Sequence, residues 1–556
     1  MATNRANVTF NDGTVIEVEK GTTIYELSKL YKKKMKYSIV GAQIDNEIVP
    51  METKINRNTE LEFIDLTTTN GFKLSKAGLQ FVIEVALKES FGPDYEVVFD
   101  HSIANGLHMT IECDKKFTLN DAKKLKTKMN EIIANDERIY NLNVENKEAI
   151  AYYNKVKAPE KALNIHNLTN KIVTMYKLRN YLNYFYSEMP YSTGCLNRYD
   201  LVFLGDNKLV LLLPSPTTKY KIPEYIHYQN VIKCFNESKK WAKSLQIPYL
   251  TDINRIVSES KVEDLIKIVE SDFDNRIHDL VSDIIKKKSK FVLLAGPSSS
   301  GKTTTTKKIA LQFRSRGYET LVISVDDYFK ERVDSPKDEN GNYDFECLEA
   351  LDIKLLNKQL KDLIAGKKVD IPEFNFVTGE KEFKNDPVKL GENAIILLEG
   401  LHSLNDEMTP ELDPELKYKV YLSPFTPLNY DRHNYVSTAD LRLMRRIVRD
   451  NRSRATDVGK TIKYWSTVRN GEEKYIFPFI NNVDAIFNTA LIYEVGVLKV
   501  FVEPLLYSVK RNSPSYNEAR RLINSLRVFF PIPSDYIPDE SILREFIGKS
   551  SFENFR

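Results

Sequence analysis

Gly296-Pro-Ser-Ser-Ser-Gly301-Lys302-Thr303 matches the pattern GxxxxGK[ST] and decides the fold around it. An apolar run at 291–295 leads into this stretch, and a helical pattern at 304–314 leads out of it. In such a strand–loop–helix unit, glycines let the backbone wrap so that successive N–H groups point at phosphate oxygens. Lys302 offers a charge to the β- and γ-phosphates, and the Thr303 hydroxyl is a ligand for Mg²⁺. The residues expected to bind the nucleotide are Gly296, Pro297, Ser298, Ser299, Ser300, Gly301, Lys302, Thr303 and Thr304.

The phosphate loop indicates a nucleotide but leaves the reaction open, because GTPases, motor ATPases and small-molecule kinases share it. Downstream of Thr303 the chain has no Asn-Lys-x-Asp motif, which would read a guanine base. We therefore expect ATP rather than GTP, with Mg²⁺ as the metal.

From residue 291 onward, strand-like apolar runs alternate with helical patterns, which is typical of a parallel α/β sheet. The expected strands are 291–295, 321–325, 394–398, 418–422 and 485–488. We assign this unit to residues 291–556.

Acidic residues follow two of these strands directly. Asp326 ends the run 321–325, and Glu399 ends the run 394–398. Because ligands of open α/β sheets bind beyond the carboxyl ends of the strands, both carboxylates are expected near the phosphate loop. Asp326 could accept a hydroxyl proton, and Glu399 could hold Mg²⁺ together with Thr303. A helix cap or a solvated turn is the alternative for either acid.

Four arginines, at positions 442, 445, 446 and 449, share one face of a helical pattern. Arginines gathered in this way suit a polyphosphate, because they neutralise charge on the transferring group. After a phosphate loop we favour a lid helix with catalytic roles for Arg445 and Arg446. A solvated face and a nucleic-acid patch are the alternatives.

The front half is expected to contain three segments. In residues 1–66, a hairpin signal at Asn11-Asp-Gly13, a capping box formed by Thr23 and Glu26, and later strands at 38–44, 47–49 and 60–64 suggest a β-grasp fold. Residues 67–240 read as α+β, with helices at 76–89, 119–134 and 171–186 and strands at 200–204 and 208–213. Residues 241–290 read as a helical linker. The expected fold class is a multidomain chain of α+β and α/β units that ends in a parallel sheet.

Taken together in order, six blocks of the back half resemble the uridine kinase and phosphoribulokinase family. Besides the phosphate loop they are Ser324-Val-Asp-Asp-Tyr-Phe-Lys330, Asn342-Tyr-Asp344, Pro372-Glu-Phe-Asn-Phe376, Leu398-Glu-Gly-Leu401 and 440–450. The resemblance implies that Asp326 is the general base and that Asp344 contacts a ribose. It also implies that Phe374 and Phe376 build the base pocket, with Arg442 among the substrate-binding residues. Asn375 and Glu346-Cys347 depart from the usual uridine kinase residues, so the nucleobase stays open.

The front half resembles the N-terminal region of threonyl-tRNA synthetase. Val8-Thr-Phe-Asn-Asp-Gly-Thr14 carries the likeness to its TGS domain over residues 7–65, and residues 70–215 resemble its editing-type domain. That family carries a HxxxH pair where this chain has Leu74 and Gly78. We therefore expect neither zinc binding nor editing chemistry in the front half.

The totals indicate a folded protein without an overall charge bias. The chain has 556 residues, 42% hydrophobic and 28% charged, with a net charge of +3. That balance gives no global reason to bind nucleic acid or a membrane. The four cysteines form no CxxC pair, and no apolar leader follows Met1, so we expect a cytoplasmic protein.

We expect phosphoryl transfer from ATP-Mg²⁺ to the 5′-hydroxyl of a pyrimidine nucleoside, uridine or cytidine, in pyrimidine salvage. The rival functions are a kinase of another hydroxyl substrate, an RNA- or ribosome-associated NTPase, and a regulator that only senses nucleotide. The expected partner is a small-molecule nucleoside. A weak RNA contact through the front half and a homo-oligomer stay open.

Overall fold

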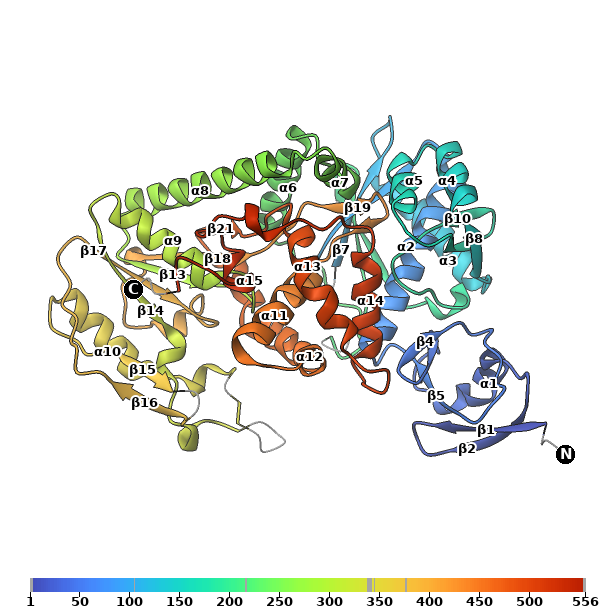
Figure 1. Cartoon of the computed structure of the whole chain (residues 1–556), viewed down its shortest axis with the longest axis horizontal. Helices are drawn as coiled ribbons and strands as arrows, with labels where there is room; N and C mark the ends of the chain where they lie inside the picture. Colours follow the sequence, from blue (N-terminus) through green and yellow to red (C-terminus); the bar gives the residue numbers. More distant parts are fainter. Residues whose placement is uncertain are drawn as a thin grey trace.

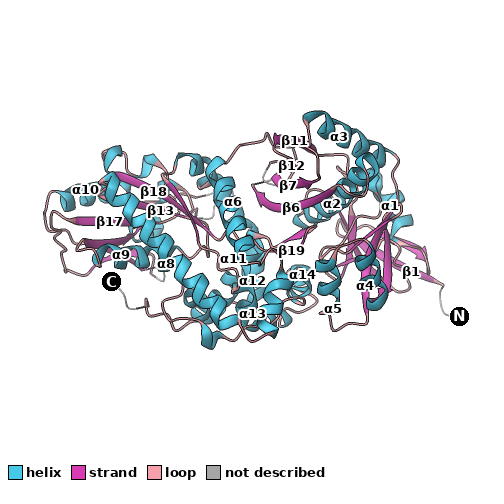
Figure 2. Ribbon diagram, turned by 90° about the horizontal axis from the view of Figure 1, so that it is seen from above, coloured by secondary structure: helices cyan, strands magenta, loops and turns pink. Residues whose placement is uncertain are grey.

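The computed structural model describes residues 4–104, 106–215, 218–337, 343–344, 346–375 and 378–553. The two views agree that the N-terminal strands lie at one end of the molecule and the large parallel sheet lies at the other (Figures 1 and 2). The last third of the chain places a group of helices between these two ends. The expected fold class, a multidomain combination of α+β and α/β units, is confirmed.

The N-terminal unit is a five-stranded sheet in the order β2-β1-β5-β3-β4 with one helix against it. The predicted capping box starts that helix: Thr23 Oγ1 accepts from Glu26 N at 3.3 Å, and Glu26 accepts from Thr23 N at 2.8 Å. The hairpin turn includes Gly13 at a φ of +79°, as a tight turn requires. The elements are β1 Arg5–Phe10, β2 Val15–Glu19, α1 Ile24–Tyr31, β3 Gly41–Ile44, β4 Glu47–Val49 and β5 Thr59–Ile64.

The next unit has two sheets, in the orders β11-β12-β7-β6 and β10-β9-β8. One long helix, α2 Thr69–Phe91, runs through it and is buried along much of its length. The other elements are β6 Glu96–Ile103, β7 Gly106–Glu112, α3 Leu119–Ala134, β8 Tyr140–Glu145, α4 Asn146–Lys155, α5 Pro159–His166, β9 Ile172–Leu178, β10 Tyr181–Asn183, β11 Asp200–Gly205 and β12 Lys208–Leu212.

The helix predicted at 171–186 is wrong, because this segment forms the antiparallel strands β9 and β10. Three successive β-branched residues open β9, and such residues favour a pleated strand over a helix. Val173 and Met175 are buried while Ile172 is exposed, which follows the two-residue period of a strand. Arg179 then turns the chain at a φ of +56°, which no α-helix contains.

The helical linker predicted at 241–290 is instead part of the C-terminal core. Residues of α7 and α8, such as Leu250, Val269 and Phe273, share one apolar cluster with Val292 and Leu294 of the parallel sheet. The apolar stripe of α8 therefore packs inward rather than bridging two units. The helices here are α6 Gln229–Ser244, α7 Leu250–Ser258 and α8 Val262–Lys287. Among the described residues, no helix is both long enough and apolar enough to span a membrane.

The C-terminal sheet is parallel throughout, in the order β14-β17-β13-β18-β21. All five predicted strands are present. β13 is buried on both faces: Val292 and Leu294 face one apolar cluster, and Phe291 and Leu293 face another. The strands are β13 Phe291–Ala295, β14 Glu319–Ser324, β17 Ala394–Glu399, β18 Lys417–Ser423 and β21 Ala485–Asn488.

The remaining elements surround this sheet or lie beside it. They are α9 Lys302–Arg314, α10 Ile353–Ile364, β15 Pro372–Asn375, β16 Glu380–Phe383, β19 Asn429–Asp431, β20 Asn434–Tyr435, α11 Thr438–Arg454, α12 Val458–Tyr475, α13 Glu494–Tyr507, α14 Tyr516–Leu526 and α15 Arg544–Ile547.

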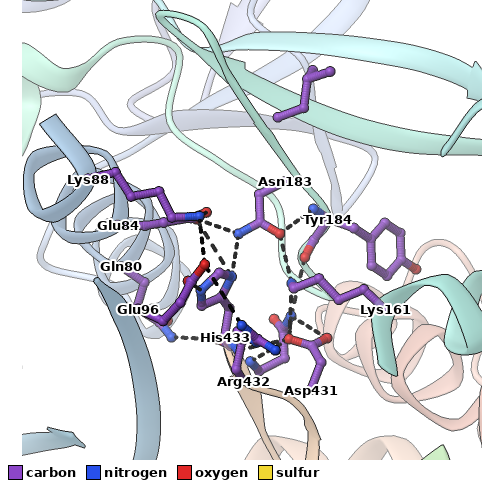
Figure 3. Close-up of polar contacts among 12 residues, drawn as sticks. Gln80, Glu84, Lys88, Glu96, Lys161, Asn183, Tyr184, Asp431, Arg432 and His433 are labelled. Atoms are coloured by element: carbon purple, nitrogen blue, oxygen red, sulfur yellow. Dashed lines mark hydrogen bonds and ion pairs between the residues drawn. The ribbon is translucent and has the colours of Figure 1, made fainter. Parts of the chain in front are cut away.

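The hairpin β19–β20 joins the C-terminal unit to the front half through buried polar contacts (Figure 3). Lys161 pairs with Asp431 at 3.0 Å, and both side chains are almost completely buried. Asn183 Nδ2 lies 2.9 Å from His433 Nδ1, and Gln80 donates to the His433 carbonyl at 3.2 Å. Burial lowers the pKa of His433 to about 3, so its ring is neutral at ordinary pH. The hairpin therefore anchors the C-terminal unit with fixed hydrogen bonds rather than a mobile contact.

Candidate active site

The phosphate loop follows β13 and ends at α9, as predicted from its sequence context. Gly296 has no room for a side chain, because a Cβ there would lie 2.3 Å from the Leu422 carbonyl oxygen. Gly301 caps α9 at a φ of +83°, and Ser299 also adopts a positive φ of +59°. The loop conformation thus depends on the glycines that define the motif.

Two loop side chains already hold partners. Lys302 Nζ donates to the carbonyls of Gly296 at 2.9 Å and Pro297 at 3.4 Å. Thr303 Oγ1 donates to Glu399 Oε1 at 3.3 Å. The strand-end acid Glu399 therefore lies against the loop, as expected from the carboxyl edge of the sheet.

Arginines lie beneath the loop and bind its carbonyl groups. Arg442 Nε and Arg445 Nη1 donate to two consecutive loop carbonyls, those of residues 298 and 299, at 2.9 and 3.5 Å. Thr489 Oγ1 donates to the next carbonyl at 2.5 Å. The carbonyls of residues 298, 299 and 300 thus point into the protein, while the Ser300 N–H donates to the Pro297 carbonyl at 3.1 Å.

Arg442 and Arg445 are placed differently from the lid that the sequence suggested. Their side chains are 2% and 0% exposed. Glu472 pairs with Arg442, with Nη1 at 3.0 Å, and Glu494 pairs with Arg445 at 2.7 Å. A cation that is buried, paired and bound to the loop backbone supports the loop, so it does not lie over the reacting groups as a lid would.

Arg446 lies closer to the open side of the site. Its Nη1 donates to Ser298 Oγ at 2.7 Å, and its Nε lies 3.2 Å from Asp450. Arg449 and Arg454 also pair with Asp450, at 2.8 and 3.7 Å. One buried carboxylate therefore balances three guanidinium groups, and this end of α11 keeps an excess of positive charge. Arg454 was not singled out from the sequence.

The strand-end acids Asp326 and Glu399 lie within electrostatic reach of Lys302. The Asp326 side chain is exposed at the surface. Partial desolvation by the surrounding protein raises its pKa, and the positive charges of Lys302 and Arg454 oppose that rise. Burial raises the pKa of Glu399 to about 7, opposed by Lys302 and reinforced by Asp326. The pKa values therefore indicate that Asp326, Glu399 and Lys302 influence one another.

Asp327 points to a different neighbour. Its Oδ1 accepts from Phe374 N in β15 at 3.2 Å, and burial raises its pKa to about 6. Adjacent carboxylates thus diverge at the end of β14, with Asp327 tied to the β15–β16 hairpin.

The structure describes two of the three residues Asp344, Phe374 and Phe376 that are predicted to contact the nucleoside. Phe374 is buried and packs edge-to-face on Phe329, with ring centres 5.7 Å apart. Asp344 Oδ1 accepts from Glu346 N at 3.0 Å. Phe376 lies outside the described residues.

Glu545 reaches the site without any signal in the sequence. It lies in the short helix α15, and its Oε2 accepts from Thr304 N at 3.3 Å and from Thr304 Oγ1 at 2.9 Å. An anion at the amino end of α9 is favoured by the helix dipole. The carboxylate therefore occupies a position where the loop motif would place a phosphate oxygen.

Comparison with known proteins finds similarity for both halves of the chain. Residues 291–494 match the model of the Phosphoribulokinase / Uridine kinase family. The C-terminal part of the chain therefore contains a domain that matches this family model. The uridine kinase of Halobacterium salinarum is 29% identical over 195 residues, which are 35% of this chain and 77% of the relative. A solved structure described as a possible uridine kinase from Bacillus stearothermophilus is 22% identical, covering 38% of this chain and 98% of its own, with a TM-score of 0.27.

The N-terminal region matches threonine–tRNA ligases. The enzyme of Caldanaerobacter subterraneus subsp. tengcongensis is 26% identical over 251 residues, or 43% of this chain. This chain spans only 39% of the length of that relative. The likeness of this chain to two unrelated enzymes agrees with a fusion of two units.

Apolar atoms surround the two positions where the synthetase pattern has histidines. Leu74 is 1% exposed and clusters with Val40 and Ile64. A Cβ on Gly78 would lie 2.8 Å from Pro190 and 2.9 Å from Leu196. Apart from Cys195, which packs against the Leu74 cluster, these neighbours are apolar side chains.

The buried pair beneath the loop predicts a difference between neighbouring arginines. Arg445→Met leaves Glu494 buried without its cation and should lower the free energy of unfolding by about 3–5 kcal/mol. Arg446→Met should cost less than about 1 kcal/mol, because Asp450 keeps Arg449 and Arg454. Denaturant unfolding of both variants measures the two costs. Equal, small costs would show that Arg445 does not support the loop.

Proposed function

We propose that the protein is an ATP-dependent nucleoside kinase that transfers the γ-phosphoryl group to the 5′-hydroxyl of uridine or cytidine, in pyrimidine salvage. The observation that carries the proposal is the carboxylate Asp326 at the end of β14, within the electrostatic reach of Lys302. The match of the C-terminal domain to a family model that includes uridine kinases supports it.

Lys302 is the group we assign to the β- and γ-phosphates of ATP. On binding, its ammonium exchanges the carbonyls of Gly296 and Pro297 for phosphate oxygens. The N–H groups of the loop and of the first turn of α9 bind further oxygens. Arg446, with Arg449 and Arg454 nearby, faces the charge that develops on the transferring group.

Thr303 and Glu399 fit a Mg²⁺ ion. Their oxygens lie 3.3 Å apart, and Mg²⁺ is commonly held by one or two carboxylates together with substrate phosphates. Among the described residues no group of three or more His, Cys, Asp or Glu is arranged to hold a metal, so an all-protein cage is not what this site provides. When bound, the ion neutralises charge on the phosphates.

Asp326 is the group we assign as general base. The 5′-oxygen of the nucleoside forms a bond to the γ-phosphorus, the bond from that phosphorus to the bridging oxygen of ADP breaks, and the hydroxyl proton passes to Asp326. A loose transition state makes this proton transfer late, so the carboxylate mainly orients the hydroxyl. Asp344 and Phe374 remain our candidates for ribose and base contacts.

A nucleoside panel tests the proposal directly. With ATP-Mg²⁺ and the full chain, uridine and cytidine should be converted to 5′-monophosphates, with Lys302→Ala as the inactive control because the loop loses its phosphate-binding charge. The product is resolved by chromatography against purine nucleosides and a sugar phosphate in parallel reactions. Faster turnover of the sugar phosphate, or ATP hydrolysis indifferent to every acceptor, would contradict the proposed substrate.

The two neighbouring acids give a matched pair of variants. Asp326→Asn should lower kcat by about 10²–10⁴, because it removes the base while keeping the shape of the side chain. Asp327→Asn should lower kcat much less, since Asp327 binds the β15 backbone. Steady-state kinetics with uridine compare them, and a larger loss in Asp327→Asn would reverse the assignment. The raised pKa of Asp326 should also place the acid limb of kcat/KM above the ordinary carboxyl range.

Glu545 should compete with the nucleotide. Glu545→Gln removes a negative charge from the position beside Thr304 and should tighten ATP binding by about tenfold, the size of one charge-assisted hydrogen bond. Glu540→Gln, an exposed acid in the same segment, is the control. Calorimetric titration with a non-hydrolysable ATP analogue measures both, and weaker binding in Glu545→Gln would show that the carboxylate assists the nucleotide instead.

A further inference from the structure

A cavity of about 620 Å³ lies between the front half and the helices of the C-terminal unit. Its walls come from the start of α2 on one side and from α11, α12 and α14 on the other. None of its lining residues belongs to the phosphate loop, and neither Asp326 nor Glu399 lines it. The volume falls in the range of small-molecule sites, and junctions between domains are common places for them.

Aromatic side chains form much of the wall. Phe72 and Tyr435 approach from one side, and Tyr421, Phe425 and Trp465 from the other. Flat aromatic faces of this kind suit a planar ring by stacking. Tyr186 also lines the cavity, and within the described chain its hydroxyl is buried without a hydrogen-bond partner. A ligand that offers an acceptor there would satisfy it.

The charged residues of the wall favour an anion. Six basic and three acidic described residues line the cavity. Lys73 and Arg521 are neutralised by Glu518 and Asp440. Lys76 and Lys463 have no carboxylate partner in the described part of the chain; Lys76 instead donates to the Tyr435 hydroxyl at 3.1 Å. The positive charge of these two lysines is therefore available to a ligand.

Two helices add their positive ends to the same wall. α2 begins at Thr69 and α11 at Thr438, and the first residues of both helices line the cavity. The partial positive charge of a helix amino end favours an anion. Together with the unpaired lysines and the aromatic faces, this places ring-binding and anion-binding groups in one space.

We propose that this cavity is a second ligand site, which binds an aromatic ring carrying an anionic group, of the mononucleotide class. The cavity adjoins the phosphate loop through Arg442, which lines it and donates to the Ser298 carbonyl, but it contains neither Lys302 nor Asp326 and does not depend on the identity of the kinase substrate. The base stacks between the aromatic walls, and the phosphate meets Lys76 and Lys463. A volume of about 620 Å³ suits a free small molecule better than a continuous polymer.

A series of ion pairs and hydrogen bonds also connects this site to the phosphate loop. Arg469 lines the cavity and donates to Glu472 at 3.0 Å. Glu472 in turn holds Arg442, which donates to the Ser298 carbonyl. A phosphate that binds Arg469 would remove Arg469 from Glu472, and Glu472 would then pair with Arg442 alone. Because Arg442 binds the Ser298 carbonyl, ligand binding in the cavity would affect the conformation of the phosphate loop.

Trp465 provides a direct readout, because the chain has two tryptophans and only Trp465 lines the cavity. In full-length Trp241→Phe protein, Trp465 is the sole tryptophan. Uridine 5′-monophosphate and adenosine 5′-monophosphate should quench its fluorescence saturably, and the phosphate-free nucleosides should need at least about tenfold higher concentration. Lys463→Glu, at an exposed position, and Lys76→Met should each weaken the quenching about tenfold or more.

Lys474→Glu is the matched control, because it makes the same charge change on α12 outside the cavity and should leave the quenching intact. Quenching that persists unchanged in both Lys463→Glu and Lys76→Met would place the nucleotide elsewhere and overturn the proposal. Absence of quenching by either mononucleotide would also overturn it. So would quenching by a single-stranded RNA oligonucleotide alone, which would assign the cavity to an RNA end.

Discussion

The phosphate loop imposes one constraint on which the C-terminal unit depends: its carbonyl groups must find donors inside the protein. A loop that turns its N–H groups toward phosphate necessarily turns its oxygens the other way. Arg442, Arg445 and Thr489 supply those donors from two different elements. The arginines are then buried, and buried cations need anions, which Glu472 and Glu494 provide from α12 and α13. One loop conformation thus fixes the packing of three helices.

The front half is connected to these buried contacts through the hairpin β19–β20. This hairpin directly precedes α11, the helix that carries both buried arginines. The hairpin bonds to Phe99 of the front half twice: Arg432 O accepts from Phe99 N at 2.9 Å, and the side-chain Nδ2 of Asn429 donates to Phe99 O at 2.9 Å. Lys161 and Asp431 add a buried ion pair. Because those groups are desolvated and satisfied together, displacing the front half would leave several of them without partners.

Much of the nucleotide-binding edge could be predicted, because β13 and most of β17 are continuous apolar runs and the acids Asp326 and Glu399 come at or just after strand ends. The rest depended on tertiary contacts. The pattern of α11 predicts that Arg442 and Arg445 share one helix face. It does not predict that this face is buried, with Glu472 and Glu494 as partners of the two arginines. The helix predicted at 171–186 is wrong because the β-branched residues at its start favour a strand. Pairing with the neighbouring strands of the sheet stabilises that strand. Glu545 belongs to no motif, and only folding brings it to Thr304.

Three residues that we assign to the nucleotide, Lys302, Thr303 and Thr304, already have partners within the chain. Lys302 holds loop carbonyls, Thr303 holds Glu399, and Thr304 holds Glu545. Nucleotide binding is then an exchange of hydrogen bonds, and only the difference between old and new partners contributes to affinity. The exchange is not uniform. Lys302 gives up neutral carbonyls for charged phosphate oxygens, a gain, whereas Thr304 gives up a carboxylate, so its contribution is close to balanced. Lys302 therefore contributes more to the free energy of nucleotide binding than the amino end of α9 does.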